Sequence, residues 1–266
     1  MRSNSAASHE LDVSEHVYVY CAVEGSPEAL PTAGMPDGGP PRTLPLMGAV
    51  SLIVSNVPAA RYNASSLEPK LADLDWVAVA GAAHHAVVDA FAEAGFVVLP
   101  FRLFTIFSHE GTALDTFKGA LPAMARAFDR VRGRQEWVLR IGKPDPTRAP
   151  GAPTGNAPAS SGTGFLRAKA DARREALARA ERVKHDARTS FEALAELADA
   201  ATSRPVDPAG SLLCDGALLV PPSRMEAVRE TLTRSAERLL REGCAVSLTG
   251  PWPPYSFASM DAAVDG

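Results

Sequence analysis

The sequence has few cysteines, no long apolar run and no large excess of charge of either sign. Its three cysteines, Cys21, Cys214 and Cys244, are odd in number and widely spaced, so they form no paired-cysteine metal or redox motif. Such residues are typical of small buried side chains in a reducing cytoplasm. No apolar run approaches the roughly 20 residues of a transmembrane helix, and residues 1–10 lack the apolar stretch of a signal peptide. We therefore expect a cytoplasmic protein without membrane insertion.

The charge of the chain argues against nucleic acid as a partner. The formal net charge is −4 at pH 7, and acidic residues lie beside the basic ones. Apolar residues make up 46% and charged residues 22% of the 266 residues, as in an ordinary soluble globular protein. This length is sufficient for one large domain or for two domains of modest size.

The usual signatures of a catalytic or metal site are also missing from the sequence. It has no glycine-rich phosphate loop, no HExxH spacing and no catalytic triad pattern. His84 and His85 are adjacent on an expected helix and point about 100° apart, so they cannot hold one metal from one face. An enzyme would need convergent polar groups, and the candidates are His84, His85, Arg102 and Glu136. We expect no enzyme, no metal and no cofactor, and keep a small-molecule enzyme and a ligand-binding regulatory domain as alternatives.

The pattern of apolar and turn-forming residues divides the chain into strands and helices. In the first half we expect strands at 17–23, 49–54 and 96–99 and helices at 76–94 and 110–132. Residues 25–45 are rich in glycine and proline and predict a loop without regular packing. In the second half we expect strands at 135–141, 211–220 and 245–248 and helices at 163–203 and 225–242. Within 211–220, Cys214-Asp215-Gly216 indicates a hairpin or a bulge.

The second half therefore reads strand, helix, strand, strand, helix, strand, which is the order of the ferredoxin-like (split βαβ) fold. The first half has a similar plan. We expect an α+β protein of two domains: an N-terminal α/β domain at 1–133 and a C-terminal ferredoxin-like domain at 134–266. At 142–162 the composition changes to Pro, Gly, Ala and Ser, which predicts a flexible insertion in the second domain.

The helix expected at 163–203 is the longest in the chain. Its apolar or small residues recur every three or four positions, at Leu177, Ala180, Val183, Ala187, Phe191, Leu194, Ala198 and Ala201. This narrow stripe is close to a coiled-coil seam and leaves self-association through the long helix open. The other face carries mixed charge, typical of a solvated surface, with Glu175 and Arg179 one turn apart.

Two aromatic segments carry the candidate contact residues. Residues 249–257 read TGPWPPYSF, and three prolines within four residues prevent a helix or a central strand and favour a stiff extended backbone. This segment either packs across the chain's own core or contacts another protein, and both readings stay open. Residues 101–107 read FRLFTIF, in which the arginine needs a carboxylate or carbonyl partner. We take as candidate protein-contact residues Trp252, Tyr255, Phe257, Arg102 and Phe107.

Several segments resemble the gas vesicle protein GvpL/GvpF family, in the same order as in that family. The most specific is TGPWPPYSF, which looks like the C-terminal signature of the family. The others are VYVYCAV at 17–23, LEP at 67–69 ahead of Trp76-Val77 and His84, LPFR at 99–102 running into TIF at 105–107, Gly133-Arg134 with Glu136-Trp137, and 162–169. The family often has Phe-Gly after the arginine, where this chain has Leu103-Phe104, and a glycine after Glu-Trp, where it has Val138.

The resemblance implies a non-enzymatic protein of gas vesicle formation, either a minor vesicle component or an assembly factor, located in the cytoplasm and the gas vesicle. Its partners would be the small, very hydrophobic shell protein and other gas vesicle accessory proteins. It also implies an α/β N-terminal domain, a ferredoxin-like C-terminal domain and no catalytic residues. Aromatic side chains on stiff backbone are suited to covering an apolar protein before it polymerises.

Overall fold

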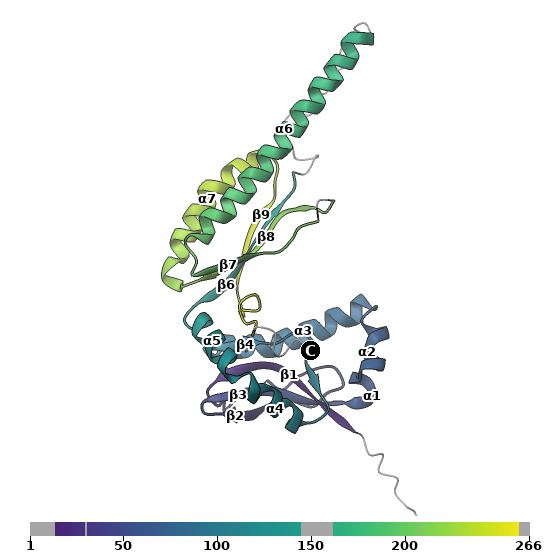
Figure 1. Cartoon of the computed structure of the whole chain (residues 1–266), viewed down its shortest axis with the longest axis vertical. Helices are drawn as coiled ribbons and strands as arrows, with labels where there is room; N and C mark the ends of the chain where they lie inside the picture. Colours follow the sequence, from purple (N-terminus) through teal and green to yellow (C-terminus); the bar gives the residue numbers. More distant parts are fainter. Residues whose placement is uncertain (1–13, 30, 145–161, 208, 261–266) are drawn as a thin grey trace, which may run out of the picture. The chain divides into compact units, whose positions relative to one another are not determined.

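The structure is a computed structural model that describes residues 14–29, 31–144, 162–207 and 209–260 (Figure 1). The chain separates into two compact units: residues 1–132 with 253–266, and residues 133–252. Each unit combines helices with one antiparallel sheet, so this is a mixed helix and sheet protein. The segment from Pro253 onward, which we expected in the second domain, belongs to the first unit. Most of the insertion expected at 142–162 lies outside the described residues.

The sheet of the first unit is built around β1 (Glu15–Glu24), whose β-branched and aromatic residues are buried along most of the strand. On one side β1 pairs antiparallel with β3 (Val50–Pro58). On the other side it pairs antiparallel with β4 (Val98–Pro100) and β5 (Ile106–Phe107). A further strand, β2 (Arg42–Met47), pairs with β3 at the edge. Strands occur at all three places expected in the first half, although the third is β4 at Val98–Pro100 and not at 96–99.

The helices of the first unit are α1 (Ala59–Tyr62), α2 (Ala64–Lys70), α3 (Leu74–Glu93), α4 (Glu110–Gly119) and α5 (Leu121–Val131). α3 begins after Asp73, whose carboxylate accepts the backbone N–H groups of Asp75 and Trp76. The chain leaves α3 through Gly95, which has a φ of 85°. The buried face of α3 packs in the core with β1. The helix expected at 76–94 is therefore confirmed.

The expectation of one helix over 110–132 is wrong, because two helices separated at Ala120 occupy this range. Pro122 lies in the first turn of α5, where its missing N–H group is not needed by the helix. In the middle of a longer helix the same proline would remove a hydrogen bond and clash with the preceding turn. The apolar periodicity therefore continues across the break, although the helix itself is interrupted.

The loop expected at 25–45 packs more closely than we predicted. Its last part already belongs to β2, and Met35 in its middle is only 2% exposed. The Met35 N–H donates to the hydroxyl of Tyr20 at 2.8 Å, and the Gly39 N–H donates to the Asn56 carbonyl at 2.8 Å. Residues without bulky side chains allow this backbone to approach β3, so the composition permits packing rather than preventing it.

The second unit contains β6 (Gln135–Gly142), α6 (Gly162–Ala195), β7 (Ala200–Ser203), β8 (Leu212–Val220), a short 3-10 helix (Pro222–Arg224), α7 (Met225–Arg241) and β9 (Val246–Trp252). The strand order is β7-β8-β6-β9 and every neighbouring pair is antiparallel. Both helices cover the same face of this sheet (Figure 1). Their shared core includes Leu139 and Leu218 from the sheet, Leu194 from α6 and Leu239 from α7.

Two local expectations in the second unit are corrected. The helix expected to reach 203 ends at Ala195, and Ala200–Ser203 forms the edge strand β7 against β8. No hairpin occurs at Cys214-Asp215-Gly216, because β8 is continuous and its irregularity lies one residue earlier, at Leu213. The glycine has a different cause: a Cβ at Gly216 would lie 2.3 Å from the ring of Phe191. The missing side chain allows the α6 ring to pack directly on the strand.

The strand β9 extends to Trp252, beyond the range 245–248 that we expected. It is an edge strand, where a proline removes no hydrogen bond of a central ladder. Its pairing with β6 shifts between Thr249 and Trp252, so Gly250 and Pro251 occupy an irregular step. The prolines of TGPWPPYSF therefore coexist with a paired strand, because the strand lies at the edge of the sheet.

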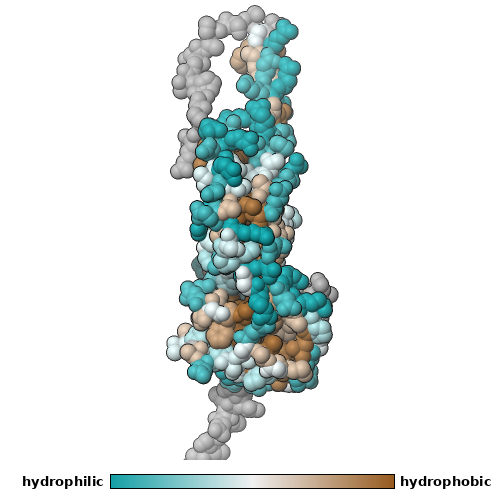
Figure 2. Space-filling model, turned by 90° about the vertical axis from the view of Figure 1, so that its left-hand side faces the viewer, coloured by the Kyte–Doolittle hydropathy of each residue, from teal (hydrophilic) through white to brown (hydrophobic). Residues whose placement is uncertain are grey.

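The apolar stripe expected on the long helix is buried only in its second half. Val183, Ala187 and Leu194 pack in the core of the second unit, whereas Leu177 is 60% exposed. Arg179 pairs with Glu242 after α7 rather than with Glu175. Figure 2 shows the first part of α6, toward the top of the view, as a largely hydrophilic surface. The sequence pattern therefore overestimates how far the buried seam extends.

Cys21, Cys214 and Cys244 are free and buried, as the sequence predicts. Burial raises the pKa of the Cys214 thiol to about 11. Across the described parts of the chain, no helix combines the length and the apolar character needed to cross a membrane.

Candidate protein-contact site

A tight turn follows β4 and presents Arg102. The backbone N–H and the hydroxyl of Thr105 both donate to the Arg102 carbonyl oxygen, at 3.2 and 2.8 Å. On either side of the turn, the Phe101 N–H donates to the Tyr20 carbonyl and the Val19 N–H donates to the Thr105 carbonyl, both at 2.9 Å. The turn is therefore held against β1, and the exposed side chain of Arg102 leaves from a well-supported backbone.

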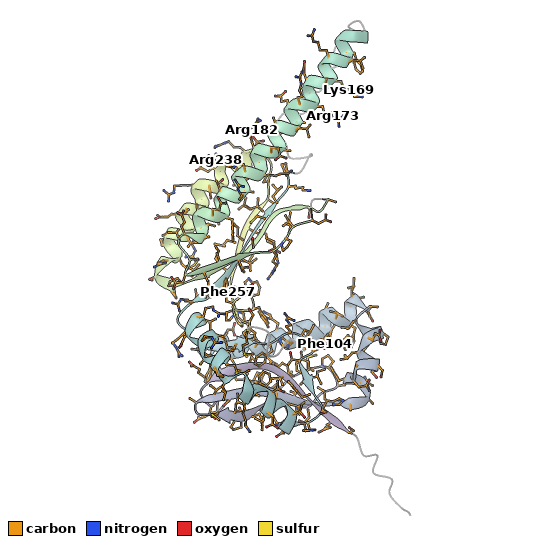
Figure 3. The ribbon with its side chains drawn as sticks, viewed as in Figure 1. Phe104, Lys169, Arg173, Arg182, Arg238 and Phe257 are labelled. Carbon is orange, nitrogen blue, oxygen red and sulfur yellow. The ribbon has the colours of Figure 1, made fainter. Side chains whose placement is uncertain are left out.

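Phe104, labelled in Figure 3, occupies the strained position of this turn. Its φ is 67°, in the left-handed region that glycine adopts at little cost and other residues rarely adopt. The resembled family often has glycine at this position. Here the ring of Phe104 stacks on Trp76, with 5.4 Å between centroids and 7° between planes, and its N–H donates to the Tyr18 hydroxyl at 3.2 Å. These contacts offset the backbone cost, so the turn survives the departure from the family pattern.

We expect Phe104→Gly to be more stable than Phe104→Ala, the reverse of the usual order. Both variants lose the stacking on Trp76, but only alanine keeps a Cβ at a positive φ, which costs about 1 kcal/mol. Urea-unfolding curves of the two variants measure this difference. Equal free energies of unfolding, or a more stable alanine variant, would contradict a left-handed backbone at this residue.

The segment after β9 is anchored in the first unit by Phe257 (Figure 3). The side chain of Phe257 is 6% exposed, and its carbonyl accepts a hydrogen bond from Arg130 of α5 at 2.9 Å. The Phe257 N–H donates to the Pro254 carbonyl at 3.0 Å, which closes a turn. Among the candidate contact residues, Phe257 is therefore an anchor within the fold, and the turn that it closes presents Tyr255.

Arg102 and Tyr255 line one groove in the first unit. The groove has a volume of about 250 Å³, and its other walls are Pro100, Phe101, Thr105, Ala258, Ser259 and Met260. Tyr255 is 37% exposed, and Arg102 is also exposed. An exposed guanidinium and a partly exposed phenol beside apolar side chains are the groups that protein interfaces favour. The two aromatic segments predicted from the sequence thus meet at one surface.

A buried hydrogen-bonded pair supports this surface from below. The ring of Tyr255 lies 6.3 Å from that of His84, and its hydroxyl lies 3.4 Å from Nδ1 of His85. Nδ1 of His84, which is 3% exposed, lies 2.7 Å from the Tyr18 hydroxyl. That hydroxyl also accepts the Phe104 N–H, so it joins His84 of α3 to the turn after β4. Burial lowers the pKa of His84 to about 4 and raises the pKa of Tyr18, so both groups are neutral at pH 7.

Most of the polar residues that an enzyme would need do not line this groove. Of the four polar residues that an enzyme would need, only Arg102 lines it. His84 is buried beneath it, and Glu136 belongs to the second unit, where it is 2% exposed. Among the residues that the structure describes, no group of three or more His, Cys, Asp or Glu side chains could hold a metal ion.

Phe107 and Trp252 are not among the residues that line this groove. Phe107 lines a second hollow of the first unit, about 430 Å³ in volume, together with His16, Tyr62, Asn63, Ala64, Leu67, Phe104, Ile106 and Ser108. Trp252 ends β9 in the second unit, is 42% exposed and donates its indole N–H to the Thr249 hydroxyl at 3.2 Å. Phe107 and Arg102 therefore line different hollows of the first unit, and Trp252 belongs to the second unit.

The sequence did not predict some wall residues of the groove or the buried pair beneath it. Ala258, Ser259 and Met260 carry no pattern that marks them as wall residues. Tyr18 was detectable in principle, since tyrosine is unusual in a strand that is buried so completely and its hydroxyl needs a partner there. Its partner, His84, is far away in the sequence and could not be assigned from spacing.

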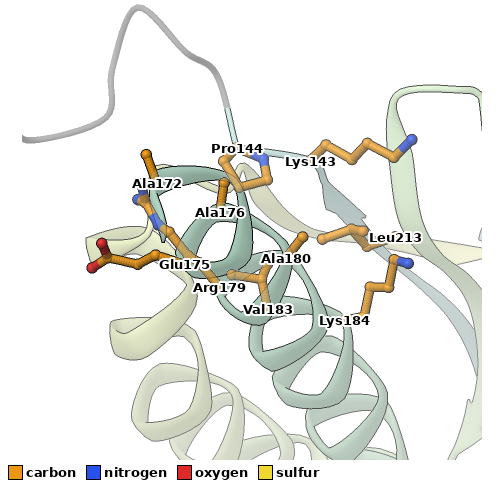
Figure 4. Close-up of a pocket in the computed structure, with 10 residues that line it drawn as sticks. All are labelled: Lys143, Pro144, Ala172, Glu175, Ala176, Arg179, Ala180, Val183, Lys184 and Leu213. Atoms are coloured by element: carbon orange, nitrogen blue, oxygen red, sulfur yellow. The ribbon is translucent and has the colours of Figure 1, made fainter. Parts of the chain in front are cut away.

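The second unit has a larger hollow of about 860 Å³ beside α6, shown in Figure 4. Small residues of α6, among them Ala172, Ala176 and Ala180, form one wall. Lys143 and Lys184 lie on one side around Leu213, and Glu175 lies on the other side. These groups provide charge at the rim but no paired acid and base.

Two antiparallel sheets with covering helices define the class of this molecule as a mixed helix and sheet protein. The chain belongs to the gas vesicle synthesis protein GvpL/GvpF family, whose sequence profile matches residues 16–259. The resemblance found in the sequence is therefore confirmed. Membership of this family supports a role in gas vesicles.

Relatives with known names agree with this assignment. The chain is 30% identical over 256 residues to gas vesicle protein L of Streptomyces sp. (strain CB03234), covering 91% of this chain and 92% of that protein. It is 28% identical to gas vesicle protein L2 of Halobacterium salinarum over 92% of both chains. The crystal structure of gas vesicle protein GvpF from Anabaena sp. PCC7120 is similar in fold, with a TM-score of 0.65 at 17% identity, covering 93% of this chain and 98% of that one. GvpF from Microcystis aeruginosa has a TM-score of 0.63 at 15% identity, with coverage of 92% and 99%.

Proposed function

We propose that this protein is a non-enzymatic assembly factor or minor component of gas vesicle formation that binds the hydrophobic shell protein and other gas vesicle proteins. The observation that carries the proposal is the groove where the two aromatic family segments meet, with Arg102 and Tyr255 at its surface. A very apolar shell protein needs a soluble partner that covers its surface until it polymerises. Tyrosine provides such contacts with little loss of side-chain entropy, and arginine adds a charged group on a long apolar stem.

The remaining details of the fold and location belong to the same proposal. We assign the second unit to the ferredoxin-like fold, since its strand order β7-β8-β6-β9 with two helices on one face agrees with a split βαβ arrangement. The protein acts in the cytoplasm and at the gas vesicle. We also propose that the chain has two domains that divide near residue 133. The segment after β9 belongs to the first of them.

We expect Tyr255→Ala and Arg102→Ala each to reduce the shell protein that co-purifies with this chain by about tenfold, the usual effect of removing an interface anchor. Met47→Ala is the matched control, because Met47 is 58% exposed and lies in β2 of the same unit. Thermal unfolding of all three variants establishes that they remain folded. Electron microscopy of cells carrying each variant in place of the natural gene then counts vesicles.

The outcomes distinguish two hypotheses: that the groove is the contact site, and that the protein has a role in gas vesicle assembly. If all three variants retain the shell protein equally, the groove is not the contact site. If deletion of the whole gene leaves vesicle number unchanged, the assembly role itself is refuted. Trp252→Ala, tested in the same way, decides whether the exposed indole of the second unit contributes separately.

A further inference from the structure

The first half of α6 extends past the core of its own unit. The residues of α6 that pack in that core begin at Val183. Before that point every residue from Phe165 to Arg182 is exposed, except Arg179, which is half-buried and paired with Glu242. Figure 3 shows Lys169 and Arg173 on this projecting part of the helix. A helix of this length in water needs packing to be stable, and here its own unit provides it only in the second half.

Apolar residues follow one side of the projecting helix. Leu166, Ala170, Arg173 and Leu177 are spaced by four, three and four positions, so they lie along one line on the surface. We call these four residues the α6 seam. Its two leucines are 66% and 60% exposed. The spacing is that of a coiled-coil contact, except that an arginine occupies one of the positions.

This part of the helix is strongly basic, although the whole chain is acidic. Between Gly164 and Lys184 there are seven cations, Arg167, Lys169, Arg173, Arg174, Arg179, Arg182 and Lys184, and three carboxylates, Asp171, Glu175 and Glu181. Asp171 pairs with Arg174, and Glu181 pairs with Lys184. Within the described residues, no ion pair is formed by Arg167, Lys169, Arg173 and Arg182.

We propose that the α6 seam binds an acidic amphipathic helix of another protein. The seam leucines would pack against an apolar stripe on the partner, and Lys169 and Arg173 would face its carboxylates. Charges in and beside a coiled-coil seam determine the partner, because unlike charges attract and like charges repel across the contact. A second copy would place Arg173 and Lys169 near cations of the same kind, which disfavours self-association through this helix. The proposal goes beyond the proposed function and does not depend on the groove around Arg102.

The binding experiment uses the full chain and a fluorescent 28-residue peptide helix with leucines at seam spacing and glutamates elsewhere. Anisotropy titrations compare the natural chain with Arg173→Glu and with Arg182→Glu. The second variant is a matched control: it makes the same change in net charge on the same helix, at a cation that also lacks an ion pair but points away from the seam. Circular dichroism verifies that both variants remain helical, as expected for glutamate in exposed helix.

We expect Arg173→Glu to weaken binding about tenfold and Arg182→Glu to change it less than about twofold. Leu166→Ala/Leu177→Ala should also weaken binding about tenfold, because the seam contributes apolar contact as well as charge. Equal effects of the two charge-reversed variants would overturn the proposal, since the binding would then be non-specific attraction. Tighter binding of vesicles of anionic lipid or of DNA than of the peptide would overturn it also. So would a dimer of the free chain in sedimentation that Leu166→Ala/Leu177→Ala abolishes.

Discussion

Replacing Gly250 by alanine is expected to destabilise the second unit by about 3 kcal/mol. Gly250 has a φ of 146°, which side chains other than glycine rarely adopt. A Cβ there would lie 2.8 Å from the Glu136 carbonyl oxygen and 3.0 Å from the ring of Trp137. Both groups belong to the central strand β6, and the indole is mostly buried, so neither can move away easily. Urea-unfolding curves followed by tryptophan fluorescence measure the loss.

Gly119→Ala provides the matched control for this substitution. Gly119 lies in α4, has no positive φ, and a Cβ there would meet no atom within 4 Å. Alanine is the better helix former by about 1 kcal/mol, so we expect this variant to be as stable as the natural protein or slightly more stable. Unfolding of Gly250→Ala at the same urea concentration as the natural protein would contradict the close approach of Gly250 in β9 to Glu136 and Trp137 in β6.

Acidification from pH 6.5 to pH 4 is expected to cost the first unit about 3 kcal/mol through His84 alone. Burial lowers the pKa of His84 from 6.5 to about 4, against a smaller opposing contribution from the backbone of Phe101. Between these two values the unfolded chain binds a proton that the folded chain does not, so the free energy of unfolding falls as the pH falls. Well above pH 6.5 and well below pH 4 this residue adds no pH dependence.

The physical cause is specific to the buried pair. His84 is 3% exposed beside Tyr18, so a charged imidazolium there would lose its hydration. His84→Gln should therefore flatten the curve of stability against pH in this window, whatever its stability at pH 7. His185→Gln on α6 is the control, because His185 is exposed, and it should retain the curve of the natural protein. An unchanged curve in the His84 variant would show that the acid sensitivity arises elsewhere.

Strong local patterns predicted most of the regular structure. β1 is recognisable because β-branched and aromatic residues follow one another, and α3 because a capping aspartate precedes it and a glycine follows it. Elements that lack such a local pattern were not predicted. Ala200–Ser203 consists of small residues without a strand pattern, and it becomes β7 only because β8 offers an unpaired edge. The apolar residues keep their helical spacing from α4 into α5, so the periodicity alone did not predict the break at Ala120.

The candidate site was predicted as two segments but not as one surface. The aromatic and proline-rich sequences marked Arg102 and Tyr255, because aromatic residues and arginine are enriched at protein interfaces. Their meeting at one groove depends on the turn that Thr105 closes and on the anchoring of Phe257 beneath α5. The same anchoring buries Phe257, so one of the five candidates supports the surface instead of forming it.

By itself, the sequence determined the class of the protein, its strongest strands and helices, and its membership of the GvpL/GvpF family, because these depend on composition, on periodicity and on short motifs. Only the tertiary structure decided that Gly216 makes room for Phe191, that Phe104 takes the backbone conformation of a glycine, and that the first half of α6 stays exposed. Each of these depends on what other parts of the chain provide at that place. Residue spacing along the chain cannot specify such long-range contacts.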